Sequence, residues 1–550
     1  MKIRNFPSPV SQAITHALLI VALAGCSSGS EHPVQDASTA IERQDYAAAR
    51  IYLMTALKEN SQDPEANYLF AKTLIELGDA EGAEAALRKL EGVDSYQAKR
   101  LPLLGKMLLL KGQNDKALEL AANPSGIYAA ELAAIKAMAQ YALGQTEEAE
   151  ASLASGLAAA PDHAELLWIA GNRNLEIGDL DAAAGNAAAA LKQSPASMEA
   201  LLLSGRIALA KADGMKALEI FSKVRELRPD NIAAEYMRGA LLLDFGRREK
   251  ARQSFETVLA NSPMHPWATY FLAQMDYDEG DTHGAFNRIQ NSKADLSQVP
   301  LSLRLTGFLE LRRGNVEQAI EPLNRYLATH PADAEAVSTL ARALIKAGNH
   351  KDAYEAIAPV AGSTTAPLDV LKLAASLANK ADSWTASAYA DRAAALEKDP
   401  ARNTIFRAEQ AIIAQDWAKA AKLYEDLLSK PHPQKPMLLN NAAMVQLNLS
   451  RGDQAVKLAR QALALAPDDP MVKDTLGWIL LQTRKDKEQA LKLIQQAADI
   501  MPQNIEIRWH LANALAANGQ KESARTIVAS LAAVAEGDQK IQLDSLRAWL

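Results

Sequence analysis

The length, composition and charge of the chain set the first limits on its structure and function. Its 550 residues are 49% hydrophobic and 23% charged, as in a well-packed globular protein, and only 5% are aromatic. Alanine is abundant, and this mixture favours closely packed helices over a β-sandwich or a β-barrel. The formal net charge of −7 argues against a nucleic-acid partner, which would need a basic face on the protein.

The first 25 residues have the features of an export signal. Lys2 and Arg4 precede an apolar stretch over residues 13–23 that is too short to span a bilayer, and the sequence LAGC follows, ending at Cys26. This ending resembles the bacterial lipobox, in which the leader is cleaved and the cysteine is lipidated. The alternative is an ordinary secretory signal with a cysteine there by chance.

Cys26 is the only cysteine of the chain, which supports its assignment as the lipidation site and excludes a disulfide bond within the chain. Ser27 follows it, and by resemblance to Gram-negative lipoproteins this residue favours sorting to the outer membrane, on the periplasmic face. We therefore predict a signal peptide over residues 1–25 and a lipidated, flexible tether over residues 26–37, through which the chain contacts the membrane.

Three kinds of marker residue recur through the rest of the chain with a period of about 34 residues. One residue, usually glycine, marks the turn inside each predicted hairpin, at Gln44, Gly78, Gly112, Gly144, Gly178, Ala212, Gly246, Gly280, Gly314, Gly348, Ala381, Gln415, Ser450, Arg484 and Gly519. An alanine follows five residues after each of the first ten turns, at Ala49, Ala83, Ala117, Ala149, Ala183, Ala217, Ala251, Ala285, Ala319 and Ala353. Prolines separate several units, at Pro161, Pro195, Pro229 and Pro263.

Each marker has a physical reason. Glycine tolerates the positive φ that ends a helix and reverses the chain, alanine lets two antiparallel helices approach closely, and proline disfavours helix between units. The period and the markers resemble the tetratricopeptide (TPR) repeat. We therefore predict an all-α fold, a right-handed superhelical solenoid of about 15 helical hairpins whose concave groove is lined by the first helix of each pair.

Composition also indicates how the solenoid is divided. The segment AGSTTAP, which begins at Ala361, is rich in small and helix-breaking residues and marks a join. We therefore predict an N-terminal array over residues 38–360 and a C-terminal array over residues 361–534. Residues 535–550 mix polar and apolar residues at helical spacing and are predicted to form a capping helix.

The sequence shows no pattern typical of a catalytic or metal site. It contains no HExxH, no pair of histidines at i and i+4, no zinc-ligand spacing and no glycine-rich phosphate loop. We therefore expect no enzymatic activity, no metal and no cofactor. Recognition of a partner is the remaining class of function.

Phasing the repeats on their glycines places several aromatic and polar side chains on the predicted groove. The candidate partner-binding residues of the fifth to eighth units are Trp168, Asn172, Tyr236, Trp267, Tyr270, Gln274, Tyr277 and Asp278. Aromatic rings with polar neighbours suit a peptide or a polysaccharide equally, because both offer apolar faces and hydrogen-bonding edges. The alternative is that these rings pack between repeats.

The C-terminal third contains four sequence segments that are more specific than the general repeat pattern, namely LLNNAAMVQL (438–447), QALALAPDDP (461–470), DTLGWILL (474–481) and HLANAL (510–515). These segments, like the lipobox, resemble the TPR lipoproteins of PEP-CTERM and exosortase systems. The resemblance implies a lipid-anchored envelope scaffold that binds export or assembly proteins and supports exopolysaccharide export or surface sorting. A second hypothesis is an assembly factor for outer-membrane proteins or pili.

Overall fold

The computed structural model describes residues 32–380 and 385–532. The chain folds into two compact units, the first extending to Ser204 and the second starting at Gly205. Cys26, the predicted signal peptide and the predicted capping helix over residues 535–550 all lie outside the described residues.

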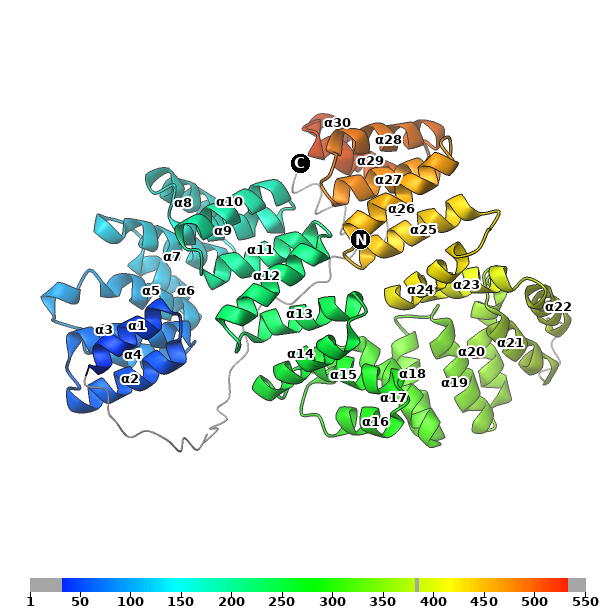
Figure 1. Ribbon diagram of the computed structural model, residues 1–550, viewed down its shortest axis with the longest axis horizontal. Helices are drawn as coiled ribbons and strands as arrows, with labels where there is room; N and C mark the ends of the chain where they lie inside the picture. The colour runs from blue at the N-terminus through cyan, green and yellow to red at the C-terminus, as the bar shows by residue number, and fades with distance from the viewer. Residues whose placement is uncertain (1–31, 381–384, 533–550) are drawn as a thin grey trace. The chain divides into compact units, whose positions relative to one another are not determined.

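The described residues form 30 α-helices, and consecutive helices pair as hairpins, one per repeat (Figure 1). The first unit contains α1 (Pro33–Glu42), α2 (Tyr46–Glu59), α3 (Pro64–Glu76), α4 (Ala80–Arg88), α5 (Arg100–Leu110), α6 (Asn114–Leu120), α7 (Ala129–Ala142), α8 (Thr146–Ala159), α9 (Ala164–Glu176) and α10 (Leu180–Gln193). The boundary between the units falls within α11 (Met198–Ala210). The predicted all-α solenoid of about 15 helical hairpins is confirmed.

The second unit continues the same alternation to the end of the described residues. It contains α12 (Gly214–Leu227), α13 (Ile232–Asp244), α14 (Arg248–Asn261), α15 (Pro266–Asp278), α16 (Thr282–Gln290), α17 (Pro300–Arg313), α18 (Val316–Leu327), α19 (Ala334–Lys346), α20 (His350–Gly362), α21 (Leu368–Lys380), α22 (Ala386–Glu397), α23 (Pro400–Ile413), α24 (Trp417–Leu428), α25 (Lys435–Asn448), α26 (Gly452–Leu465), α27 (Pro470–Gln482), α28 (Lys487–Ile500), α29 (Ile505–Ala517) and α30 (Lys521–Ala532).

The turns inside the hairpins occur where the sequence predicts them. Of the predicted turn residues, every one that the structure describes has a positive φ, between 53° at Arg484 and 89° at Gly280, while Ala381 lies outside the described residues. Five of these residues are not glycine, so the left-handed conformation is required by the hairpin even where a side chain makes it costly. Several turns are followed at once by an aspartate that caps the second helix, as Asp79 caps α4 by accepting a hydrogen bond from Gly82 N–H.

The predicted alanines and prolines also have the expected positions. All ten of the alanines that follow the first ten turns are completely buried, as their place between two packed helices requires. Pro161, Pro195, Pro229 and Pro263 lie in the connections between one repeat and the next. Stacking of these repeats buries the apolar faces that a single hairpin leaves open.

Two predicted boundaries differ from the structure. The first helix begins at Pro33, inside the predicted tether, because proline suits a first helical turn and Ala37, Ala40 and Ile41 provide a buried face. The predicted join at residue 361 lies within the second unit, where Val360 and Ala361 belong to a continuous buried cluster.

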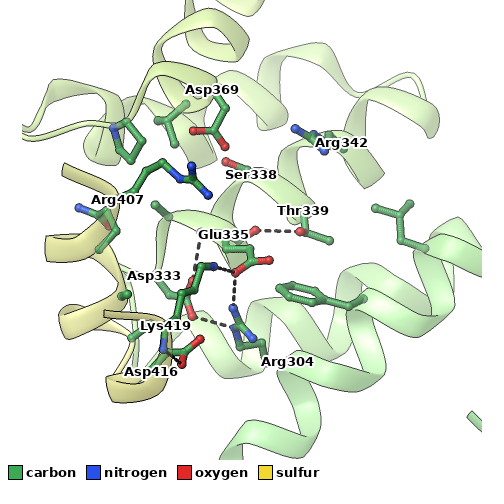
Figure 2. A pocket seen from close by; sticks show the side chains of 18 of the residues that line it. Arg304, Asp333, Glu335, Ser338, Thr339, Arg342, Asp369, Arg407, Asp416 and Lys419 are labelled. Carbon is green, nitrogen blue, oxygen red and sulfur yellow. Dashed lines mark hydrogen bonds and ion pairs between the residues drawn. The ribbon is translucent and has the colours of Figure 1, made fainter. Parts of the chain in front are cut away.

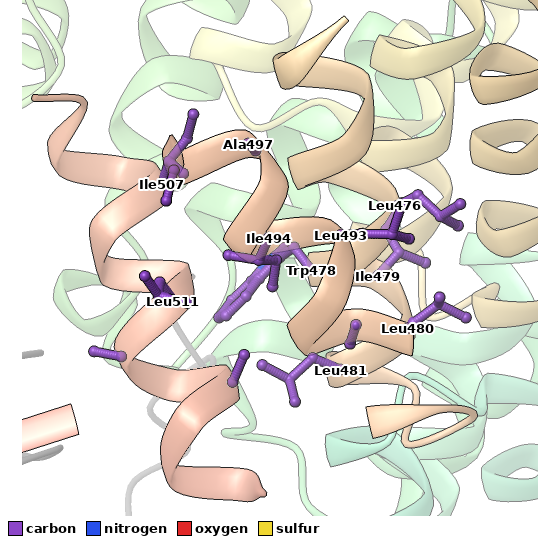
Figure 3. Packing of buried hydrophobic residues seen from close by; sticks show 14 of the residues in the cluster. Leu476, Trp478, Ile479, Leu480, Leu481, Leu493, Ile494, Ala497, Ile507 and Leu511 are labelled. Atoms are coloured by element: carbon purple, nitrogen blue, oxygen red, sulfur yellow. The ribbon is translucent and has the colours of Figure 1, made fainter. Parts of the chain in front are cut away.

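The C-terminal repeats share a large apolar core, which Figure 3 shows around Trp478, Ile479 and Ile494. A polar pair is buried beside it. The Trp478 ring stacks on the His510 ring with centroids 4.1 Å apart, and His510 Nδ1 lies 2.8 Å from Asp474 Oδ2. The pair joins α27 to α29, so the first helices of consecutive hairpins are held by a polar contact as well as by apolar packing.

Two hairpin turns of the second unit, far apart in the sequence, pair through their backbones. Gly214 N–H donates to the Ser450 carbonyl oxygen at 2.7 Å, and Gly452 N–H donates to the Ala212 carbonyl oxygen at 2.9 Å. We call this pairing of the α11–α12 turn (212–214) with the α25–α26 turn (450–452) the clasp. An added Cβ at Gly214 would lie only 2.7 Å from the Ser450 oxygen, so the close approach requires glycine there.

Candidate functional site

The second unit contains a cleft of about 390 Å³. Its walls come mainly from the first helices of successive hairpins, α15, α17, α19, α21 and α23, with Lys419 added from α24. This is the face that the sequence predicts as the groove, because the first helix of each TPR hairpin should line it. Figure 2 shows how charged side chains from α17, α19, α21, α23 and α24 converge on the cleft.

A network of four charged side chains forms one part of the cleft. Arg304 on α17 donates from Nε to Asp333 Oδ2 and from Nη2 to Glu335 Oε2, each at 2.9 Å. Lys419 Nζ on α24 donates to the same Glu335 oxygen at 3.0 Å, across 84 residues of sequence. The network therefore ties three helices together around one carboxylate (Figure 2).

Local structure explains why Asp333 is held in place. It is the N-cap of α19, and its Oδ1 accepts hydrogen bonds from the backbone N–H groups of Glu335 and Ala336. Its other carboxylate oxygen accepts from the Tyr326 hydroxyl at 3.0 Å as well as from Arg304. With only 2% of its surface exposed, Asp333 is a buried acid whose charge is fully compensated by hydrogen bonds.

The electrostatics of the network follow from these contacts. Burial opposes the charge of Arg304, but the carboxylates of Asp333 and Glu335 raise its pKa above the ordinary value. Burial alone would raise the pKa of Glu335, and the nearby cations Arg304 and Lys419 lower it instead. For Asp416, the N-cap of α24, the effect of burial is larger than that of the nearby hydrogen-bond donor and cations, and the pKa is raised. Arg304 and Glu335 are thus fixed in their charged forms.

A second set of polar groups in the cleft is not engaged in this network. Arg342 on α19 and Arg407 on α23 are both exposed, and neither has an ion-pair partner among residues 32–380 and 385–532. The hydroxyl of Ser338 and the amide oxygen of Gln410 are buried without a hydrogen-bond partner in the same part of the chain. The apolar part of the wall includes Phe308.

Of the predicted groove residues, Tyr277 is the one that lines the cleft. It is half-buried at the end of α15, and the Arg312 guanidinium lies over its ring, 4.4 Å from the centroid. Tyr277 therefore offers a ring face and a neighbouring cation to a partner. Its role in binding stays a prediction.

The other aromatic residues predicted in the second unit form part of the packing between helices. Tyr270 is only 6% exposed, and its ring centroid lies 5.5 Å from that of Phe271. Trp267 is half-buried and meets Tyr270 edge to face at 6.3 Å, while Tyr236 lies 4.9 Å from the His265 ring of the next hairpin. Each of these rings stabilises its own repeat or the contact with its neighbour.

The predicted polar residues are held by contacts within their own helices or with the preceding one. Gln274 Nε2 donates to Asp278 Oδ1 at 2.7 Å, and Asp278 is 3.3 Å from an Arg248 nitrogen. In the first unit, the Asn172 amide donates to the Trp168 carbonyl oxygen at 3.1 Å, and Trp168 packs partly buried against an apolar cluster. A partner would have to compete with these contacts or bind beside them.

A signal for the cleft was present in the sequence. The register that places Tyr236 and Tyr270 on the groove continues, at the same spacing of 34 residues, to Arg304 and Ser338. The same step from Phe308 reaches Arg342. The predicted line of groove residues ends in the eighth unit, whereas the cleft extends four repeats further, to α23 and α24.

Two further searches cover the part of the chain that the structure describes. It holds no group of three or more histidine, cysteine, aspartate or glutamate side chains placed to bind a metal ion. Within the same residues, no helix combines the length and the apolar character that crossing a membrane requires.

Comparison with known proteins identifies the family. Two family models described as tetratricopeptide repeat match the chain, one over residues 40–94, 310–377 and 483–550, the other over residues 136–185, 170–232, 236–291 and 408–470. Together these segments cover well over half of the chain.

Individual relatives are distant. The TPR repeat-containing protein YpiA of Bacillus subtilis (strain 168) is 22% identical over 325 residues, which cover 57% of this chain and 74% of YpiA. The β-barrel assembly-enhancing protease of Escherichia coli (strain K12) is 26% identical over 111 residues, 20% of this chain and 23% of that protein. The crystal structure of the APC/C hetero-tetramer Cut9–Hcn1 is similar with a TM-score of 0.31 at 15% identity, covering 87% of this chain and 95% of that one. The matched repeats and the helical hairpins agree, and the chain belongs to the tetratricopeptide repeat family as a scaffold for protein–protein interactions.

Proposed function

We propose that the chain is a lipid-anchored scaffold of the bacterial envelope, and that the cleft of its second unit holds a segment of a partner protein. The cleft carries this proposal. It lies on the first helices of five successive hairpins and combines apolar walls with polar groups that no residue of the described chain satisfies. Such groups cost free energy when buried alone, and a bound partner would compensate for it.

A site-specific crosslink tests whether the cleft is occupied. A photo-reactive amino acid at Thr339, which lies in the cleft, should capture a partner in intact cells of the native host. Thr257 on α14 is a matched control, because both threonine hydroxyls bond the carbonyl oxygen four residues earlier in a helix. The proposal predicts a crosslinked product from position 339 and none from position 257. Equal products, or none from either position, would contradict it.

The lipid anchor rests on the sequence. LAGC ending at Cys26 supports processing and acylation at that residue, and Ser27 supports retention at the outer membrane, on the periplasmic face. Metabolic labelling with an alkyne fatty acid should modify the parent chain, whereas a Cys26→Ala variant should carry no label and leave the membrane fraction. If the variant is labelled and fractionates as the parent does, the anchor lies elsewhere.

The pathway is proposed from the closing repeats. Their resemblance to the TPR lipoproteins of exosortase systems supports a role in exopolysaccharide export or surface sorting, by binding rather than catalysis. A deletion strain should then lose secreted polysaccharide or sorted surface proteins while its outer-membrane porins stay at normal levels.

A second candidate is an assembly factor for outer-membrane proteins or pili. The local similarity to the β-barrel assembly-enhancing protease favours it, although that similarity covers 20% of this chain. Under this alternative the deletion strain should lose outer-membrane proteins or pili and keep its secreted polysaccharide. The two phenotypes therefore separate the two candidates.

A further inference from the structure

The cleft contains two arginines whose charges are not compensated. The neighbouring Arg304 is saturated by two carboxylates, whereas Arg342 and Arg407 have no carboxylate within ion-pair distance in the described part of the chain. Figure 2 shows Arg407 extending from α23 toward α19, the helix that carries Arg342. Both guanidinium groups line the cleft with free donors for an anionic group, and the exposed Asp369 carboxylate of α21 lines the same cleft.

A buried hydroxyl marks the same place. Ser338 lies one helical turn before Arg342, and its side chain lines the cleft although the residue is only 6% exposed. Its Oγ has no hydrogen-bond partner in the described residues. A serine hydroxyl left unbonded at this depth costs free energy, and an anion bound by the arginines would accept its hydrogen bond.

The remaining groups indicate what kind of molecule carries the anion. The Gln410 amide oxygen is buried and unbonded, so it needs a donor such as a peptide N–H group. Phe308, Leu311, Pro367 and Val370 add apolar wall to the cleft. A carboxylate acceptor, an N–H donor and apolar surface occur together in a peptide with acidic side chains.

We propose that this cleft binds an acidic segment of a protein partner, with a side-chain carboxylate held by Arg342, Arg407 and the Ser338 hydroxyl. The inference rests on the proposed function, in which the cleft holds a protein segment, and adds the chemistry of that segment. A net charge of −7 on the whole chain would repel acidic peptides elsewhere, so the uncompensated arginines also provide selectivity.

Fluorescence anisotropy with the purified full-length chain tests the chemistry. The probes are two fluorescein-labelled peptides of leucine, glycine and either glutamate or glutamine, identical otherwise and amidated at the C-terminus. At low ionic strength the glutamate peptide should bind at least about 10-fold more tightly than the glutamine peptide, because charge-assisted hydrogen bonds are the main difference. Equal binding of the two peptides would overturn the proposal.

Variants locate the binding. Arg342→Gln and Arg407→Gln should each weaken the glutamate peptide about 10-fold, and Ser338→Ala several-fold, with smaller salt dependence in the arginine variants. Arg325→Gln is the control, because Arg325 is an exposed arginine of α18 that pairs with Glu321 outside the cleft. If the Arg342 and Arg407 variants bind like the control while circular dichroism shows all three folded, the carboxylate site is elsewhere.

The outcomes separate this inference from the proposed scaffold function on which it rests. Oligogalacturonate, an acidic sugar polymer, is tested as a second ligand. If it binds through Arg342 and Arg407 while the glutamate peptide does not, the peptide assignment is wrong. If the crosslink from Thr339 captures a protein whose binding is unchanged by Arg342→Gln and Arg407→Gln, the scaffold function stands and the acidic-segment inference fails.

Discussion

Replacing Gly214 by alanine tests the clasp, the backbone pairing of residues 212–214 with residues 450–452. Gly214 is the first residue of α12, and the structure gives it no positive φ, so alanine is compatible with the backbone itself. The obstacle is space. An added Cβ would lie 2.7 Å from the Ser450 carbonyl oxygen and 3.2 Å from the Phe245 ring. The α25–α26 turn would have to move away.

Two opposing free energies decide the size of the effect. Alanine in place of glycine in a helix contributes up to about 1 kcal/mol of stability. Separation of the turns would lose the hydrogen bonds from Gly214 and Gly452, at about 0.5 to 1.5 kcal/mol each. We therefore expect a net loss of roughly 0 to 3 kcal/mol. Gly185→Ala in α10 is the control, because beyond the adjacent residues and backbone of its own helix nothing lies within 4 Å of its added Cβ, so only the stabilising contribution remains.

Urea unfolding measures the stability, and a distance measurement shows whether the turns separate. Spin labels are attached to cysteines introduced at two exposed sites, Met215→Cys and Gln454→Cys, in a Cys26→Ser background. The distance distribution between the two spin labels should be short and narrow, and it should broaden when Gly214→Ala is added. Hydrogen exchange at Gly214 and Gly452 should accelerate together. If Gly214→Ala stabilises the chain as much as Gly185→Ala and the label distance is unchanged, the two turns do not pair in solution.

Three other perturbations follow from the structure. Tyr270→Ala should destabilise the chain by about 3 to 5 kcal/mol in urea unfolding, because the Tyr270 side chain is buried, with 6% of the residue exposed. Under conditions in which the variant stays folded, it should capture the partner as the parent does. Burial of Tyr96 and its hydrogen bond to Glu65 raise its pKa from 10.0 to about 12. The stability that this residue contributes below pH 10 should therefore fall by on the order of 2 to 3 kcal/mol as the pH rises to 12. In alkaline unfolding titrations, Tyr96→Phe should remove this part of the loss. Burial alone would raise the pKa of Glu335, but Arg304 and Lys419 lower it by more, so its ion pairs stabilise the chain at pH values above the ordinary glutamate pKa. The difference in stability between Glu335→Gln and the parent should shrink as the pH falls below about 4. A difference that stays constant would contradict this reasoning.

The sequence predicted the repeating part of the fold because each marker acts locally. A left-handed residue at the turn, a small residue five positions later and a proline between units each constrain only one hairpin and its neighbour. The spacing predicts even the non-glycine turns at Gln44 and Ser450, because the period of about 34 residues continues where glycine is replaced. The early start of α1 was missed because a short polar segment with a proline reads as a tether when it is considered alone.

The candidate site was less predictable, for two physical reasons. Groove positions can be counted from the register, but burial depends on the neighbouring repeat. The register therefore predicts Tyr270 on the groove, although its side chain is buried in the structure. The chemistry of the cleft depends on which charges compensate each other. Lys419 and Glu335 are 84 residues apart, and nothing in their local sequence indicates that they meet.

The long-range contacts change how the second unit should respond to damage. In a simple solenoid each repeat contacts only its neighbours, so stability is a sum of local terms and the ends can unfold independently. The clasp and the Glu335–Lys419 pair add contacts between repeats that are not neighbours. Both are made by polar groups, through hydrogen bonds of 2.7 to 3.0 Å. Loss of a contact at the start of α26 would therefore reach the α11–α12 turn directly, without passing through the fourteen helices between them. The cleft lies within the segment that the clasp closes.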